Sequence, residues 1–393
     1  MAADVGLDAR YEGRTVTGTA RGLSQPRVIP VAAPVLAGNE QAYVLDCLQS
    51  TWISAHGEYI GRFEAAFSEF CGARHAICCS SGTAALHLAL LALGVGPGDE
   101  VLVPTLTFVA TANAVTFCGA RPVFIDAEPG TWNIDPSLLE ARITPRTKGI
   151  VAVHLYGHAA EMDSVLAVAQ RHGLFVIEDA AEAHGAQYRG RPVGTFGNIA
   201  TFSFSGNKTI TTGEGGMVVT DDAALAAKVC QLKAQAMDPA RRYWFPRIGF
   251  NYQLTNIAAA IGLAQMEMAS WHVERRHQVA SWYREDLDGV SGITWQTEQP
   301  WAKHAYWMFS VLVDEGVRQR DLIIAHLAER GIETRPVFYP LHTLPPYRSA
   351  AANTMWPVAE RIARRGLSLP TWGGLTREDV RYVSECLRDC LGQ

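Results

Sequence analysis

One lysine lies in a loop whose composition suits covalent chemistry on a bound group. Lys208 follows a strand-like run at 201–204 and precedes the glycine-rich stretch Gly-Glu-Gly-Gly at 213–216. Glycines and hydroxyl side chains let the backbone come close to a ligand, while the flexible lysine stem carries its amine to it. An isolated lysine in a turn is more often a solvated surface residue, so the interpretation depends on the groups that accompany it.

Acids follow another apolar run, at residues 174–177. Asp179 ends that predicted strand, and Glu182 comes three residues later. Ligands of open α/β sheets bind at the carboxyl ends of the strands, which is where this run delivers both carboxylates. The plain alternative is a solvated strand end without a ligand.

The third group is a helix start at Ser81-Gly82-Thr83-Ala84. The free N–H groups and the dipole of a helix start attract anions, although the same residues are also ordinary caps. A lysine for a Schiff base, a carboxylate for a protonated pyridine nitrogen and an anion site for a phosphate are the groups that pyridoxal 5'-phosphate requires. Together they predict a pyridoxal-phosphate site.

Alternating apolar runs and helical patterns from about residue 74 to 232 predict the scaffold for these groups. This alternation is typical of a mostly parallel sheet covered by helices. We expect strands at 75–79, 101–104, 122–126, 149–155, 174–179, 200–204 and 216–220, and helices at 84–94, 108–117 and 162–172. A helical pattern at 258–287, a strand at 304–313 and helices at 318–330 and 376–391 predict a smaller α+β lobe. The expected division is a flexible tail at 1–28, a large domain at 29–264 and a small domain at 265–393.

Composition limits the other classes of protein. The chain has 393 residues, of which 48% are apolar, and a net charge of -5. A nucleic-acid-binding protein is expected to be basic, so we expect no such partner. No apolar run reaches the roughly 20 residues of a membrane span, and the N-terminal segment has no apolar core, which predicts a cytoplasmic protein with no membrane partner. The eight cysteines include no C-x-x-C pair, so we expect reduced thiols and no metal site.

Several longer segments carry a resemblance to a known family. They are Trp52-Ile53-Ser54 with Gly57, and residues 82–86, 98–101, 178–182, 208–216, 241–246 and 249–252. On these segments, from about Ile29 to the C-terminus, the chain resembles the DegT-type sugar aminotransferases. These are pyridoxal-phosphate enzymes of the aspartate-aminotransferase fold (fold type I). The resemblance implies an α/β fold whose large domain has a mostly parallel seven-stranded sheet, with a smaller α+β C-terminal domain.

Carried over by position, the resemblance also implies residue roles. Lys208 would form the Schiff base and act as general base, and Asp179 would pair with the pyridine nitrogen. Glu182 would lie beside the ring hydroxyl, with Phe108 and Ala181 on the two ring faces. The implied phosphate contacts are the backbone at Thr83 and Ala84, the Ser203 hydroxyl and, from a second subunit, Asn251; Gly82 is a further cofactor-binding candidate. The Asn251 contact implies a homodimer whose active site is shared between subunits.

The resemblance further implies a substrate. Within the family, the Arg-Arg-Tyr-Trp-Phe-Pro segment at 241–246 points to perosamine-type sugars. The implied reaction transfers an amino group from L-glutamate to the 4-keto group of GDP-4-keto-6-deoxymannose, giving GDP-perosamine. The candidate substrate residues are Trp52, Ser54, Tyr59, Arg241, Arg242, Arg335 and His342; Arg241 and Arg242 could equally belong to a subunit interface.

Two departures leave the sugar open. Ala234 and Ala236 stand where close relatives are expected to have glycines, and Gln253 replaces an expected arginine. Neither touches the cofactor chemistry. The alternatives are an aminotransferase for another nucleotide keto-sugar, with a 3-keto group, a different nucleotide or a longer sugar, and a regulatory or binding protein that keeps the fold without turnover.

Overall fold

The structure, a computed structural model, describes residues 28–314, 320–348 and 355–393. All of the expected N-terminal tail except Val28 therefore lies outside the described residues. All eight cysteines are free, and all but Cys230 are buried. The domain limits stay a prediction, but the two sheets lie in the parts of the chain expected for the two lobes.

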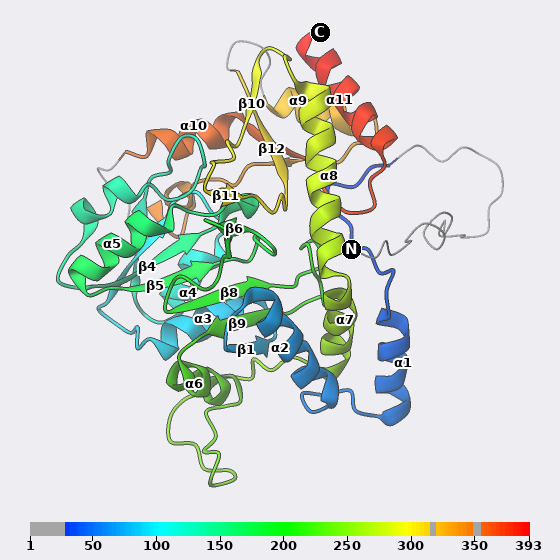
Figure 1. The fold of residues 1–393 in the computed structure, drawn as a ribbon. Helices are drawn as coiled ribbons and strands as arrows, with labels where there is room; N and C mark the ends of the chain where they lie inside the picture. Colours follow the sequence, from blue (N-terminus) through cyan, green and yellow to red (C-terminus); the bar gives the residue numbers. More distant parts are fainter. Residues whose placement is uncertain (1–27, 315–319, 349–354) are drawn as a thin grey trace.

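A seven-stranded sheet forms the larger part of the molecule (Figure 1). Its strands are β1 (His75–Cys79), β2 (Glu100–Pro104), β3 (Arg121–Ile125), β4 (Thr147–Val153), β5 (Phe175–Asp179), β8 (Ile199–Ser203) and β9 (Gly216–Thr220). Their order is β1-β9-β8-β5-β4-β2-β3. β9 runs antiparallel to its neighbours β1 and β8, and the other neighbouring strands pair parallel. The predicted mostly parallel α/β sheet is confirmed.

Both faces of this sheet are covered, because alternate side chains of a strand point to opposite sides. Val101 and Val103 of β2 pack with helices α3, α4 and α6, whereas Leu102 packs with α2, α5 and α7. The helices of this part are α1 (Glu40–Ser50), α2 (Glu58–Cys71), α3 (Gly82–Ala92), α4 (Ala110–Phe117), α5 (Met162–His172), α6 (Ala223–Lys233) and α7 (Asn256–Glu267).

A second, antiparallel sheet forms the smaller part, with the order β10-β12-β14-β13. Its strands are β10 (Ile293–Trp295), β12 (Phe309–Val313), β13 (Arg335–Pro336) and β14 (Gly366–Leu369), and its helices are α8 (Ala269–Leu287), α9 (Arg320–Glu329), α10 (Pro357–Arg365) and α11 (Arg377–Leu391). A three-stranded ribbon joins β6 (Gln187–Tyr188) and β7 (Arg191–Pro192) to β11 (Ala302–Lys303). In Figure 1, α7 and α8 run along one side of both parts and connect them.

Two predicted elements differ in length from those observed. The long helix expected at 258–287 is interrupted at Met268, where φ is -111° and ψ is 13°. The strand expected at 304–313 begins only at Phe309, because Tyr306 adopts a left-handed conformation with φ 48°. The preceding backbone instead pairs with another loop, since Trp307 N donates to the Tyr156 carbonyl at 3.0 Å.

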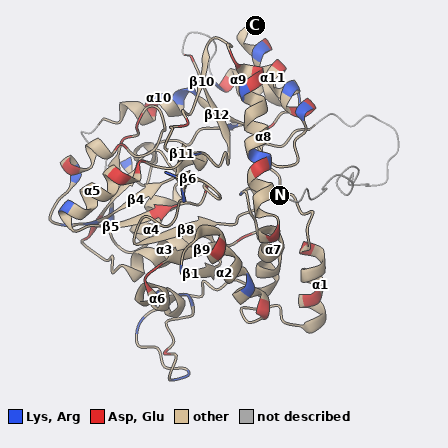
Figure 2. Ribbon diagram, viewed as in Figure 1, with Lys and Arg blue, Asp and Glu red and all other residues tan. Residues whose placement is uncertain are grey.

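The surface carries both signs of charge. In the view of Figure 2, basic and acidic residues are intermixed along the ribbons of α5 and α11. Within the described ranges, no helix combines the length and apolar character that crossing a membrane requires.

Candidate active site

A cavity of about 490 Å³ opens at the carboxyl edge of the large sheet. Val153, Asp179 and Ser203, the last residues of three parallel strands, all line it. The starts of α3 and α4 form one side, and Trp307, Arg335 and other residues of the smaller part form the other. Its volume lies in the range usual for cofactor and substrate sites.

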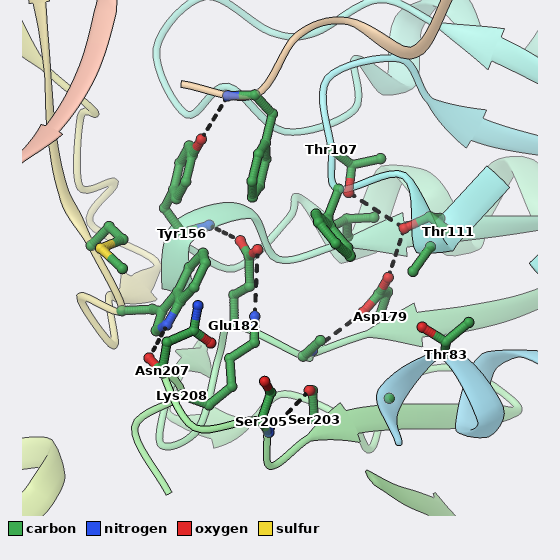
Figure 3. Close-up of a pocket in the computed structure, with 18 of the residues that line it drawn as sticks. Thr83, Thr107, Thr111, Tyr156, Asp179, Glu182, Ser203, Ser205, Asn207 and Lys208 are labelled. Atoms are coloured by element: carbon green, nitrogen blue, oxygen red, sulfur yellow. Dashed lines mark hydrogen bonds and ion pairs between the residues drawn. The ribbon is translucent and has the colours of Figure 1, made fainter. Parts of the chain in front are cut away.

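Lys208 projects into this cavity from the loop between β8 and β9 (Figure 3). Its Nζ lies 3.7 Å from Oε1 of Glu182 and 3.8 Å from the centre of the Trp307 ring. Burial lowers the pKa of Lys208, because the ammonium loses its hydration, while Glu182 and Asp179 act in the opposite direction. A larger share of this amine is therefore neutral and able to accept a proton than in an exposed lysine.

Glu182 lies beside the lysine on the loop that follows β5. Its Oε2 accepts a hydrogen bond from the Tyr156 amide at 2.8 Å. Burial raises the pKa of Glu182 to about 7, against the opposing effect of Lys208. This carboxyl can therefore change protonation near neutral pH while it faces an amine.

Asp179 lies deeper in the cavity and faces α4. Its Oδ2 accepts a hydrogen bond from the Thr111 hydroxyl at 2.8 Å, and its Oδ1 accepts one from the Ala181 amide at 3.2 Å. Burial raises the pKa of Asp179, and these two hydrogen bonds oppose that rise. A cation placed beside such a buried carboxylate would be held strongly.

The helix start at α3 lies on the cavity wall, where the sequence predicted an anion site. Gly82 and Thr83 line the cavity, whereas the Ala84 amide donates to the Ser81 hydroxyl at 3.1 Å. A Cβ added to Gly82 would come within 2.7 Å of the Ser203 Cβ. Only glycine therefore lets the helix start and Ser203 approach this closely, beside one another on the cavity wall.

The functional groups in this cavity are those that binding of pyridoxal phosphate requires. The cavity brings together a buried amine, a buried carboxylate and a helix start with a neighbouring hydroxyl, contributed by Lys208, Asp179, Thr83 and Ser203. Phe108 and Ala181 also line it. Phe108 is half exposed at the mouth, with its ring centre 5.8 Å from that of Phe338.

Of the candidate substrate residues, Arg335 lines the cavity. Tyr59 instead hydrogen-bonds Asp46 at 3.0 Å in the core beneath α1, and the buried His342 packs on Trp356 with its ring centre 4.1 Å away. The exposed residues Trp52, Ser54, Arg241, Arg242 and Asn251 lie outside the cavity lining of this single chain.

The loop at 234–250 carries the substituted alanines. Gln235 and Ala236 both adopt positive φ, 62° and 57°, and Ala236 is fully buried. Left-handed backbone favours glycine, so the expectation of glycine near this point has a physical basis. Figure 1 shows this loop, which follows α6, extending away from the body of the molecule.

Sequence reasoning missed several residues of the cavity. They include Thr111, which hydrogen-bonds Asp179, and Tyr156, whose amide hydrogen-bonds Glu182. Trp307, whose ring contacts Lys208, is the third. Trp307 lies in a recognisably aromatic segment, 306–309, but nothing local indicates that it meets a loop 100 residues earlier. Glu178, by contrast, points away from the cavity, since neighbouring strand residues alternate.

Comparison with known proteins agrees with this geometry. The model of the DegT/DnrJ/EryC1/StrS aminotransferase family matches residues 34–388. GDP-perosamine synthase from Caulobacter vibrioides is 53% identical over 365 residues, which cover 92% of this chain and 98% of that protein.

Two solved structures share the fold. DesV of S. venezuelae, in complex with a ketimine intermediate, has a TM-score of 0.85 and 37% identity over 90% of this chain and 95% of its own. The PLP-form of Spr1654 from Streptococcus pneumoniae has a TM-score of 0.88 and 28% identity, over 93% of this chain and 99% of its own. These matches confirm the predictions of the aspartate-aminotransferase type of fold and of a pyridoxal-phosphate sugar aminotransferase. The chain belongs to the DegT/DnrJ/EryC1/StrS aminotransferase family.

Proposed function

We propose that this enzyme transfers the amino group of L-glutamate to the 4-keto group of GDP-4-keto-6-deoxymannose and so makes GDP-perosamine. The main support is the cavity that Lys208, Glu182 and Asp179 line together, in which Lys208 Nζ lies 3.7 Å from Glu182 Oε1. The 53% identity to a GDP-perosamine synthase, over 92% of the chain, supports the choice of sugar. A cytoplasmic location remains a prediction, to be tested by fractionation of cells.

When bound, pyridoxal phosphate carries the amino group between substrates and accepts the electrons left when a carbon loses a proton. Lys208 has the position to hold the cofactor covalently and, once released, to take and return that proton at Nζ. Asp179 would keep a proton on the ring nitrogen, since a carboxylate beside that nitrogen raises its pKa. Glu182 would accept a hydrogen bond from the ring hydroxyl.

The other contacts would orient the cofactor. Thr83, Ser203 and the amides of the helix start are the candidate phosphate ligands, because N–H and O–H groups there can donate to phosphate oxygens. Ala84 would contribute less than its neighbours, since its amide already donates to Ser81. Phe108 and Ala181 would contact the two faces of the ring, and Gly82 lets the chain approach.

Arg335 is the candidate for an anionic group of either substrate, because a guanidinium fork suits carboxylate and phosphate. For the other five exposed or loop residues, Trp52, Ser54, Arg241, Arg242 and Asn251, we propose that a second subunit brings them to the cavity. For Tyr59 and His342, which already have core partners, we propose only an indirect role in shaping the surrounding loops.

The cofactor claim is tested by borohydride reduction after incubation with pyridoxal phosphate. We expect one covalent adduct, found by mass spectrometry on the peptide that contains Lys208, and none in Lys208→Ala. Lys148→Ala, which removes a half-exposed lysine near Asp99, is the matched control and should keep the adduct. Failure of the wild-type protein to form the adduct would refute the proposal.

The substrate claim is tested with a panel of nucleotide keto-sugars, each with glutamate, by the release of 2-oxoglutarate. Turnover of GDP-4-keto-6-deoxymannose above 3-keto sugars and other nucleotides is expected. The shared site is tested by mixing Lys208→Ala and Asn251→Ala chains. Their mixed dimers contain one site with both residues intact, and should regain activity that neither variant has when pyridoxal phosphate is limiting.

A further inference from the structure

Trp307 makes two contacts with the lysine loop. Its indole Nε1 donates a hydrogen bond to the carbonyl of Asn207 at 2.9 Å, directly before Lys208. Its ring lies beneath the lysine amine, with Nζ 3.8 Å from the ring centre. An ammonium over an indole face within about 6 Å is attracted by the ring quadrupole, and most strongly when both are shielded from water.

The indole is itself held from three directions. Tyr156 stacks on it with ring centres 6.0 Å apart and planes at 13°, and the Trp307 amide donates to the Tyr156 carbonyl at 3.0 Å. Arg276 of α8, fully buried, donates to the Trp307 carbonyl at 2.7 Å. Because Trp307 is 4% exposed and fixed in this way, the indole presents a rigid surface to the lysine.

We propose that Trp307 is a positioning residue for Lys208: its indole face holds the protonated amine, and its N–H fixes the loop that carries it. The inference rests on the proposed function, in which Lys208 alternates between covalent attachment and proton transfer. Whenever the amine is released and carries a proton, it would contact both the indole face of Trp307, 3.8 Å away, and the Glu182 carboxylate, 3.7 Å away. The indole is uncharged, so Glu182 is the one charged partner in these two contacts.

The charge on Lys208 also responds to its other neighbours. Glu182 and Asp179 favour the ammonium, and Arg276 opposes it. Glu214 and Arg335 line the same cavity. His184 is buried nearby, and burial together with Lys208 and Arg276 lowers its pKa to about 3, so that it is neutral at physiological pH. Loss of burial would raise the pKa of Lys208, because water would solvate the ammonium. Loss of the indole face would lower that pKa, because the ammonium would lose an attractive contact.

The test compares Trp307→Phe with Trp307→Leu in the full chain. Pyridoxal phosphate is first removed by dialysis, so that the Lys208 amine is free. Acetic anhydride then labels neutral amines, and mass spectrometry of the Lys208 peptide between pH 6 and 10 gives the pKa of that amine. Both replacements shorten the side chain and remove the indole N–H, but only phenylalanine keeps a π face. We expect the pKa of Lys208 to be lower in Trp307→Leu than in Trp307→Phe, by about 0.4–1.5 units for a cation–π contact.

Trp295→Leu is the control, because Trp295 packs on Phe309, 5.9 Å between ring centres, and does not line the cavity. It should leave the Lys208 pKa unchanged. Equal pKa values in the two Trp307 variants, or a higher value in Trp307→Leu, would overturn the inference, since loss of packing alone admits water and raises the pKa. The borohydride adduct on Lys208 is recorded in parallel: its presence leaves the proposed function standing even if this inference fails.

Discussion

Removal of the Thr111 hydroxyl should lower both the stability of the folded chain and its affinity for pyridoxal phosphate, because Asp179 loses a hydrogen-bond donor. In the folded chain this hydroxyl donates to Asp179 Oδ2 at 2.8 Å, and both side chains are buried. A hydrogen bond to a charged group contributes about 1.5–3 kcal/mol, which corresponds to about 1–2 units of pKa. Thr111→Val should therefore raise the pKa of Asp179 further above its ordinary value.

The consequence depends on pH. At neutral pH, Thr111→Val should lower the free energy of unfolding by about 1.5–3 kcal/mol, because the charged carboxylate loses a donor. Because burial raises the pKa of Asp179 in the folded chain, its ionisation lowers the stability progressively as the pH rises from the unfolded pKa to the folded pKa, and the cost is constant above that. Thr111→Val raises the folded pKa further, so the two proteins differ most above both folded pKa values. The deficit of the variant should thus shrink as the pH falls through the pKa of Asp179.

Urea denaturation between pH 8 and pH 4 measures this difference. The matched control is Thr116→Val on the same helix, because the Thr116 hydroxyl donates to the backbone carbonyl of Ala112 at 3.1 Å rather than to a carboxylate. Its cost should not vary with pH. An equal loss in the two variants, or a loss in Thr111→Val that is the same at every pH, would refute the reasoning. The same Thr111→Val protein should also retain pyridoxal phosphate less tightly in equilibrium dialysis.

Three further outcomes are expected. Since the pKa of Glu182 is raised to about 7, the wild-type free energy of unfolding should fall as the pH rises from about 4.5 to about 7, and Glu182→Gln should flatten that slope in urea titrations. Glu178→Gln should cost about 1–3 kcal/mol at pH 7, because the glutamine NH2 group cannot accept the hydrogen bonds that the buried carboxylate accepts from His154 and from backbone amides. Since the pKa of Glu178 is lowered in the folded chain, this loss should diminish at acid pH, which calorimetry at two pH values measures. Gly82→Ala should lower the affinity for pyridoxal phosphate in equilibrium dialysis, because the added Cβ would clash with Ser203, and overpacking of this kind costs about 1–3 kcal/mol. Gly96→Ala is the control and should keep the affinity, because a Cβ there would enter open space.

Glu178 and Asp179 illustrate where sequence reasoning ends. Both acids follow the same apolar run, and nothing in their order says which one faces a ligand. The structure turns Asp179 to the cavity and buries Glu178 behind the sheet, where His154 and the amides of Gly194, Phe196 and Gly197 donate to it. Burial alone would raise the pKa of Glu178, but these hydrogen bonds lower it on balance, so this carboxylate holds a loop in place.

Local patterns determined much of this protein. The strand at 75–79, the helix at 162–172 and the strand at 216–220 have the bounds that periodicity and turn residues predicted, because burial on a sheet or a helix face repeats over a few residues. Lys208, the acidic strand end at 178–179 and the start of α3 were recognisable for the same reason. Each is a short segment whose residue types already suit its chemistry.

Only the tertiary structure decided which distant residues complete the cavity. Trp307 reaches Lys208 through the packing of the smaller part against the large sheet. Tyr156 reaches Glu182 because β4 and β5 are parallel neighbours, which brings the loops after them together. Arg335 lines the cavity, while His342, seven residues later, lies in the core. Residues so far apart meet according to how whole elements pack, and that packing depends on the sum of many buried contacts rather than on any local pattern.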